Sequence, residues 1–128
     1  MSEQDITREA QQIMFIVPGQ PQPKARARVV NGHGYTPAKT KVYERLIANC
    51  AAVEIRRTWP LDARYSVEVL ACFSDARRRD LDNVLKSVLD ALNNLAYADD
   101  SQVDWMRIER GEVRKTTPRT IVIVKVLT

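Results

Sequence analysis

The chain has 128 residues, enough for one domain with a hydrophobic core but too few for two. Its 20 lysine and arginine residues exceed its 16 acidic residues, and the net charge of +4 suits a polyanionic partner without requiring one. No apolar run approaches the roughly 18 residues of a membrane span and the N-terminus is too polar for a signal peptide, so we expect a cytoplasmic protein that does not contact membranes.

The N-terminal part of the chain predicts a tail, a strand and a loop. Met1–Gln12 is polar and is expected to form a flexible tail, which leaves residues 13–128 as a single domain. Ile13–Val17 is a compact apolar run followed by a proline and a glycine, the pattern of a buried strand. Pro18–Arg28 contains three prolines and no periodicity, which predicts an exposed loop.

Basic residues alternate with small ones along this loop: Lys24, Arg26 and Arg28. In an extended chain all three side chains can point to one side and contact a DNA backbone. A solvated loop that happens to be basic explains the same pattern equally well, so both interpretations stay open.

A hairpin and a helix are expected next. Asn31-Gly32 is a turn signal that predicts a small hairpin over Val29–Tyr35. Thr36-Pro37 is a typical helix start, and the helix is expected to run to Arg57. Its predicted buried stripe consists of Val42, Leu46, Cys50 and Val53.

The remaining elements predict a mixed sheet. Tyr65–Phe73 alternates with the period of a strand, a helix follows over Leu81–Leu95, and a third strand is expected over Val103–Glu109. Thr120–Leu127 is a final strand, expected to form an antiparallel hairpin with the preceding one. The fold class is therefore α/β (α+β), with a single mixed β-sheet, two main helices and the order β-α-β-α-β-β.

The helix over Leu81–Leu95 separates its residues completely by polarity. Leucines and valines occupy one side, and the other side carries Asp82, Asn83, Lys86, Ser87, Asp90, Asn93 and Asn94. Asp80 or Asp82 is expected at the N-terminus, where a carboxylate is stabilised by unpaired N–H groups. Capping explains one of these aspartates and leaves the other, with the preceding arginines, without a structural role.

Carboxylates and arginines gather densely around this helix. Asp80 and Asp82 precede or open it, and Asp99 and Asp100 follow it and compete for a third ligand position. Oxygen ligands without a histidine or cysteine cluster favour Mg²⁺, with Mn²⁺ as a substitute, and no small-molecule cofactor is expected besides the metal. The run Arg77, Arg78 and Arg79 suits phosphate contacts, although one of the three can instead neutralise a neighbouring aspartate.

The stretch RRRDLDNVLKSVLDAL followed by DDSQVD resembles the RusA family of Holliday junction resolvases. The shared signature is an arginine-rich run into D-L-D-N, a lysine four residues after the second aspartate, and a D-D pair after the helix. The resemblance is strongest over Asp75–Arg107 and extends over Ile13–Leu127.

This resemblance implies an endonuclease that resolves four-way DNA junctions by paired nicks, in recombination, repair or phage DNA processing. It implies Asp80, Asp82 and Asp100 as metal ligands, with Asn83 and Asp99 in supporting roles. Lys86 would stabilise charge on the phosphate, whereas a simple surface pair with Asp82 is the alternative interpretation. A basic module that binds nucleic acid without cleaving it is the alternative function.

Paired nicks in a two-fold symmetric junction imply a C2 homodimer. The predicted helix from Asp82 to Leu95 would span roughly 20 Å, and the five steps from Leu95 to Asp100 reach at most about 18 Å. We therefore expect Asp100 to complete the metal site of the partner subunit, and the alternative is an intrachain site, which would need a stretched return or a helix that ends early.

Overall fold

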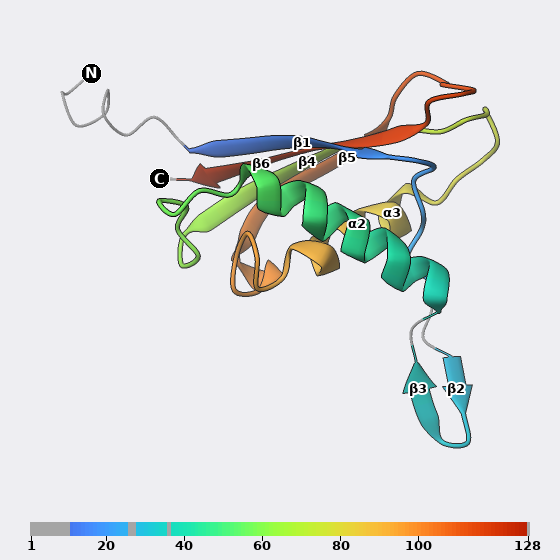
Figure 1. Cartoon of the computed structure of the whole chain (residues 1–128), viewed down its shortest axis with the longest axis horizontal. Coiled ribbons are helices and arrows are strands. Elements are labelled where there is room, and N and C mark those ends of the chain that lie inside the picture. Colours follow the sequence, from blue (N-terminus) through green and yellow to red (C-terminus); the bar gives the residue numbers. More distant parts are fainter. Residues whose placement is uncertain (1–10, 26–27, 36, 128) are drawn as a thin grey trace.

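A computed structural model describes residues 11–25, 28–35 and 37–127, and most of the predicted tail 1–12 lies outside them. The main elements are β1 (Gln12–Pro18), α2 (Ala38–Glu54), β4 (Arg64–Cys72), α3 (Leu81–Leu92), β5 (Val103–Arg110) and β6 (Arg119–Leu127). The four strands form one mixed sheet in the order β1-β6-β4-β5, and both helices cover the same face of it (Figure 1). This arrangement confirms the predicted α+β class.

The predicted hairpin between the last two strands is wrong. β5 pairs with β4 in parallel, as expected for strands joined by a crossover helix, and β6 pairs antiparallel with both β4 and β1. The connection from β5 to β6 passes the end of β4, where the N–H of Gly111 donates to the carbonyl of Ala71 over 2.9 Å. The strongly apolar β6 thereby takes an interior position, and the charged β5 takes the edge.

The buried stripe of helix α2 is shifted from the predicted one, because Leu46 and Cys50 are only partly buried against the core. Val42 and Val53 are 67% and 82% exposed, whereas Thr40, Tyr43, Ile47 and Ala51 are buried. The phenol of Tyr43 shares a 2.6 Å hydrogen bond with the hydroxyl of Thr120 on β6, which fixes the helix rotation. The helix also ends at Glu54 rather than at Arg57.

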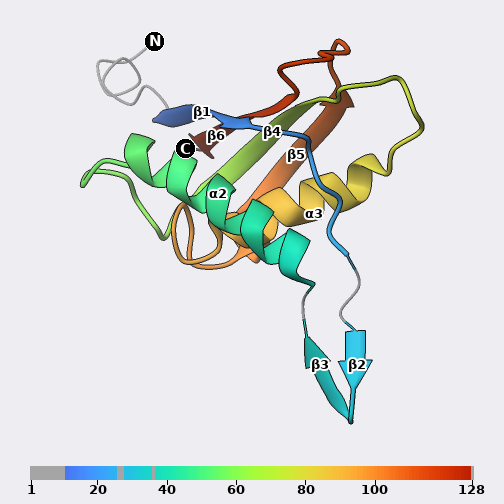
Figure 2. The ribbon, with the colours of Figure 1, turned by 45° about the vertical axis from the view of Figure 1, so that its right-hand side comes forward.

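The predicted small hairpin is confirmed as a separate two-stranded sheet, β2 (Arg28–Val30) and β3 (His33–Tyr35). Asn31 and Gly32 form its turn with φ values of 51° and 80°, the left-handed conformation that this residue pair favours. The hairpin projects away from the sheet and helices, beside the start of α2 (Figures 1 and 2).

Gly111 marks a close approach of the β5–β6 connection to β4. A Cβ atom there would lie 2.6 Å from the sulfur of Cys72 and 3.0 Å from Cγ of Leu70, closer than van der Waals contact permits. Gly111→Ala is therefore expected to lower the free energy of unfolding by about 1–3 kcal/mol, measured by urea denaturation. Adding Cys72→Ala should recover part of the loss, and an unchanged midpoint in the single variant would contradict this packing.

Candidate functional site

Helix α3 presents the first acidic pair at its N-terminus. Asp80 is the N-cap, as predicted, and its carboxylate accepts hydrogen bonds from the backbone N–H and the side-chain amide of Asn83, at 3.3 and 2.8 Å. Asp82 lies in the first turn and is exposed. Two oxygen-donor side chains therefore stand together at the positive end of a helix, a donor set that fits a hard divalent cation.

The polar face of α3 differs from the sequence prediction in two respects. Ser87 is completely buried although it lies on the predicted polar side. Its hydroxyl donates to the carbonyl of Gln22 over 3.1 Å. The helix also ends at Leu92, three residues before the predicted end. The segment that contains Gln22 therefore covers part of the helix that the sequence pattern assigns to solvent.

Two adjacent recesses meet at Asp80 and Asp82. One, of about 360 Å³, is also lined by Lys24, Ala25, Asn83 and Lys86. The other, of about 520 Å³, is lined by Arg78, Arg79, Asp80, Leu81 and Asp82. Cationic side chains thus stand on both sides of the carboxylates, which suits a metal-bridged phosphate.

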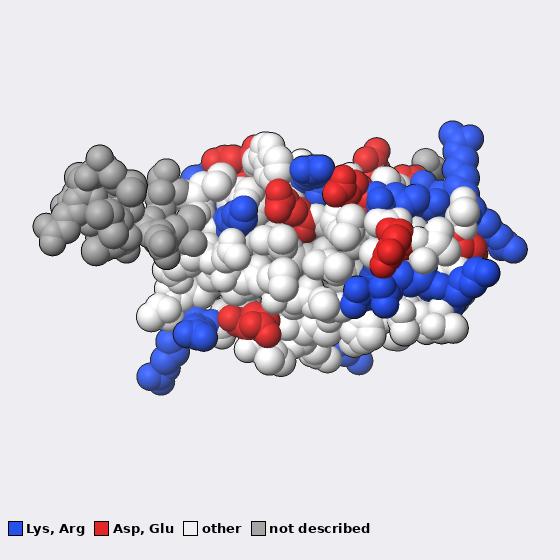
Figure 3. Space-filling view, turned by 90° about the horizontal axis from the view of Figure 1, so that it is seen from above, with Lys and Arg blue, Asp and Glu red and all other residues white. Residues whose placement is uncertain are grey.

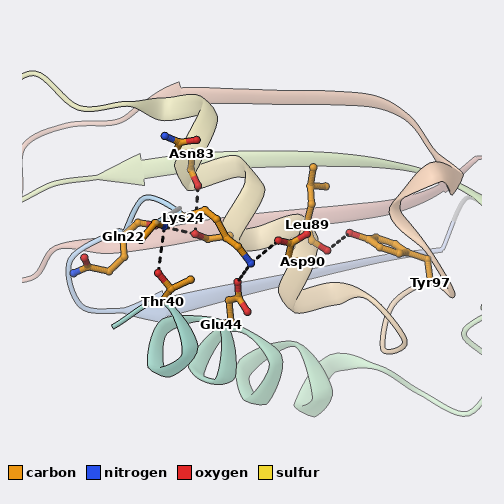
Figure 4. Close-up of polar contacts among 10 residues, drawn as sticks. Gln22, Lys24, Thr40, Glu44, Asn83, Leu89, Asp90 and Tyr97 are labelled. Atoms are coloured by element: carbon orange, nitrogen blue, oxygen red, sulfur yellow. Dashed lines mark hydrogen bonds and ion pairs between the residues drawn. The ribbon is translucent and has the colours of Figure 1, made fainter. Parts of the chain in front are cut away.

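Two carboxylates hold the ammonium group of Lys24, whose side chain is partly buried. Its ammonium lies 2.7 Å from a carboxylate oxygen of Glu44 on α2 and 2.7 Å from one of Asp90 on α3 (Figure 4). Burial lowers the pKa of Lys24, but hydrogen bonds and charge interactions with Asp90 and Glu44 outweigh it and raise the pKa above its usual value. Its backbone N–H also donates to the carbonyl of Asn83 over 2.7 Å.

Lys24 therefore joins both helices to the segment that borders the recess, and Asp90 is one of its two partners. Of the other two basic residues of the predicted arm, Arg26 lies outside the described residues. The backbone of Arg28 begins β2.

The three consecutive arginines occupy different environments. The guanidinium of Arg79 lies 2.7 Å from a carboxylate oxygen of Asp75. It also lies 5.2 Å from the ring centre of Phe73, and the guanidinium of Arg110 lies 4.9 Å from the same ring centre. The Arg79 side chain is only 28% exposed, whereas that of Arg77 is 83% exposed. Arg79 therefore fixes the loop before α3 and lowers the pKa of Asp75, the neutralising role that the sequence left open for one arginine.

The second acidic pair lies beyond the opposite end of α3. Asp99 caps the short 3-10 helix η1 (Asp100–Gln102), since its carboxylate accepts from the N–H of Ser101 over 2.9 Å. The pKa of Asp100 is raised by burial and then by the negative charges of Asp99 and Asp90. A cation beside Asp100 would relieve this cost of ionisation.

One chain does not bring the two acidic pairs together. Across residues 11–25, 28–35 and 37–127, no three histidine, cysteine or acidic side chains are grouped closely enough to hold a metal ion. The early end of α3 leaves eight steps for a return from Leu92 to Asp100, a reach of up to about 26 Å. The chain instead packs Tyr97 into the core, where its phenol donates to the carbonyl of Leu89 over 2.8 Å.

Basic residues gather at the end of the molecule where the loops 73–80 and 111–118 lie side by side (Figure 3). The N–H of Arg114 donates to the carbonyl of Phe73 over 2.8 Å, which ties the second loop to the first. Lys115 is exposed on this second loop. Lys115 is not among the basic residues that were predicted from the sequence to contact DNA, although the basic composition of its loop is a signal for it.

Comparisons with known proteins identify relatives. Residues 18–125 match the family described as Endodeoxyribonuclease RusA. The chain is similar to the crossover junction endodeoxyribonuclease rusA of Enterobacteria phage HK97, with 48% identity over 50 residues, which span 38% of this chain and 42% of that protein. It is also similar to the uncharacterized protein YqaN of Bacillus subtilis (strain 168), with 30% identity over 77% of this chain and 86% of that protein.

The described part of the chain contains no helix that is both long and apolar enough to cross a membrane.

Proposed function

The chain belongs to the RusA endodeoxyribonuclease family, and from this premise we propose that it is a Mg²⁺-dependent endonuclease that resolves Holliday junctions by paired, symmetric nicks. The observation that carries the proposal is the pair Asp80 and Asp82, exposed at the N-terminus of α3 between recesses lined by basic side chains. Such an arrangement joins metal-binding carboxylates to a phosphate-binding surface.

Each residue of this site has a proposed role. Asp80 and Asp82 hold the Mg²⁺ ion, for which Mn²⁺ can substitute, and the bound ion supplies Lewis-acid activation of the scissile phosphate and of water. Asn83 keeps the Asp80 carboxylate in place through its two hydrogen bonds. Lys86 points into the same recess and donates to a phosphate oxygen as negative charge develops there.

We further propose that Asp100 completes the metal site of a partner subunit in a C2 homodimer. The separation of the two acidic pairs supports this arrangement, because α3 alone accounts for about 17 Å between them. A four-way junction has approximate two-fold symmetry, so a symmetric dimer presents one site to each of two opposed strands. Asp99 supports the partner-facing segment by capping η1.

The direct test is nicking of a synthetic four-way junction by the purified protein with and without Mg²⁺, with a linear duplex of the same sequence as the control. Mg²⁺-dependent nicks in two opposed strands of the junction, with an intact duplex, are expected. Junction binding without nicking under all metal conditions would favour a non-cleaving nucleic-acid-binding module and contradict the proposal.

DNA affinity should separate exposed arginines from Lys24. Arg77→Ala is expected to weaken junction binding. The negative slope of log K against log salt should become shallower by about one unit, because one phosphate contact is lost. Lys24→Met should leave that slope unchanged and lower thermal stability, because Glu44 and Asp90 lose their shared cation. Fluorescence anisotropy across a salt series measures both slopes, and thermal denaturation measures the stability. A reduced slope for Lys24→Met would instead identify Lys24 as a DNA contact.

A further inference from the structure

We propose that Lys24 is a positioning residue for the metal site, which acts through Asn83 on the carboxylate of Asp80. The ion pairs of Lys24 hold the segment Gln22–Ala25 against α3, and this segment keeps the first turn of the helix in the geometry that binds the metal ion. The inference rests on the proposed function for the identity of the metal site. It adds to that site a residue that contacts neither the metal ion nor DNA.

Asn83 connects the segment to the first metal ligand. Its backbone carbonyl accepts a hydrogen bond from the N–H of Lys24 over 2.7 Å (Figure 4). Its own N–H and its side-chain amide donate to the two different oxygens of the Asp80 carboxylate, at 3.3 and 2.8 Å. Each carboxylate oxygen keeps a lone pair for a metal ion, so Asn83 orients Asp80 without blocking it. A shift of Asn83 would therefore turn a metal ligand.

Hydrogen bonds attach the two ends of this segment to different helices. On α3, the buried hydroxyl of Ser87 donates to the carbonyl of Gln22 over 3.1 Å. On α2, the buried hydroxyl of Thr40 accepts from the N–H of Ala25 over 3.3 Å. The position of the segment therefore depends on how the two helices are held together.

The ammonium of Lys24 supplies a charged attachment to both helices. It lies 2.7 Å from a carboxylate oxygen of Glu44 on α2 and 2.7 Å from one of Asp90 on α3, and the Lys24 side chain is only 27% exposed. Hydrogen bonds between charged groups are stronger than those between neutral groups. Without the ammonium, the two carboxylates would be left uncompensated and would repel each other beside the segment. Loss of Lys24 should therefore loosen the segment and, through it, Asn83.

Direct contact with DNA is the competing role for Lys24. This residue lines the recess of about 360 Å³ together with Asp80, Asp82 and Lys86, so a phosphate bound there would lie near it. To bind the phosphate, however, the ammonium of Lys24 would have to leave two carboxylates, which would then face DNA without their shared cation. Lys86 is exposed and lines the same recess, so it is better placed to bind the phosphate.

Amide hydrogen exchange tests the positioning without metal or DNA. In Lys24→Met, the N–H groups of residue 24 and of Asn83 should exchange at least about tenfold faster than in the wild type, because the contacts that protect them are loosened. Val124→Ala is the matched control, since it removes buried methyl groups from β6 and lowers the stability of the whole domain. It should leave the exchange of these two N–H groups unchanged, which separates local loosening from a general loss of stability.

Metal affinity tests the consequence for the site. The dissociation constant of Mn²⁺, measured from the EPR signal of the free ion, should rise about fivefold or more in Lys24→Met and stay unchanged in Val124→Ala. Lys24→Arg keeps a cation between the two carboxylates and should restore most of the affinity. In single-turnover cleavage at saturating protein, Lys24→Met should be slow at low Mg²⁺ and should recover as Mg²⁺ is raised.

A wild-type value of either the Asn83 exchange rate or the Mn²⁺ dissociation constant in Lys24→Met would overturn the positioning role. Equal Mn²⁺ binding by Lys24→Met and Lys24→Arg would overturn it too, as would the same losses in Val124→Ala. If the wild-type protein nicks junctions in any of these cases, the proposed function survives. Faster exchange and weaker Mn²⁺ binding in Lys24→Met, beside a wild type that never nicks a junction, would instead support the positioning role and reject the proposed function.

Discussion

Asp82→Asn is expected to lower the rate of junction cleavage by at least about a hundredfold while junction binding is retained or tightened, and Asp80→Asn should behave in the same way. Loss of a group that only supports a metal ligand already costs about 10–100-fold, so loss of a ligand itself should cost more. Asparagine keeps the side-chain shape but removes a negative charge that faces the DNA phosphates, so binding should not weaken.

Single-turnover cleavage at saturating protein separates this loss of chemistry from any change in affinity. Asp62→Asn is a suitable control, because it removes the same charge from an exposed position outside the site. Cleavage by both Asp80→Asn and Asp82→Asn at the wild-type rate would reject the metal site. A loss of binding in parallel with cleavage would instead make these aspartates part of the DNA-binding surface.

The helix that carries Asp80 and Asp82 could be predicted because its signals are local. The complete separation of polar and apolar residues over Leu81–Leu95 predicts the helix, which ends at Leu92, and the aspartates at its start predict the cap that Asp80 provides. Asp99 likewise caps η1 through residues close to it in the sequence, Ser101 and Gln102. These caps join residues at most three positions apart and therefore leave a pattern in the sequence.

The errors arise where a distant partner decides between local alternatives. The buried hydroxyl of Ser87 donates to the carbonyl of Gln22, and the rotation of α2 is fixed by the contact of Tyr43 with Thr120, which lies 77 residues away. Lys24 has the sequence environment of an exposed basic arm, yet Glu44 and Asp90 from two helices enclose its ammonium.

The strand order of the sheet was missed for a related reason. Consecutive strands joined by a short loop favour a hairpin locally, and only the burial of the whole sheet places β6 between β1 and β4. This order leaves β5 at the edge of the sheet among the described strands. The sequence separation of Asp100 from Asp80 favours a composite site, and this site stays a prediction.

A composite site makes a large and unusual prediction for mixed dimers. Asp82→Asn and Asp100→Asn chains should each be inactive alone, because every site in either homodimer lacks one metal ligand. In a heterodimer of the two chains, one site would combine both lesions, and the other would combine the intact Asp80 and Asp82 of one chain with the intact Asp100 of its partner. One working site per dimer should therefore be restored.

The product identifies this restored site. One working site should nick a single strand of a four-way junction, so nicked junctions should accumulate without the paired cuts that resolve them. A heterodimer of wild-type and Asp82→Asn chains is the matched control, because it contains one working site whether Asp100 acts within its own chain or in its partner.

The decisive measurement is therefore the nicking rate of Asp82→Asn/Asp100→Asn heterodimers, isolated through two different affinity tags. A site built from both subunits predicts nicking at a rate similar to that of the wild-type/Asp82→Asn control, from two chains that are inactive as homodimers. Heterodimers as inactive as the two homodimers, beside an active control, would show that Asp100 does not complete the partner's site.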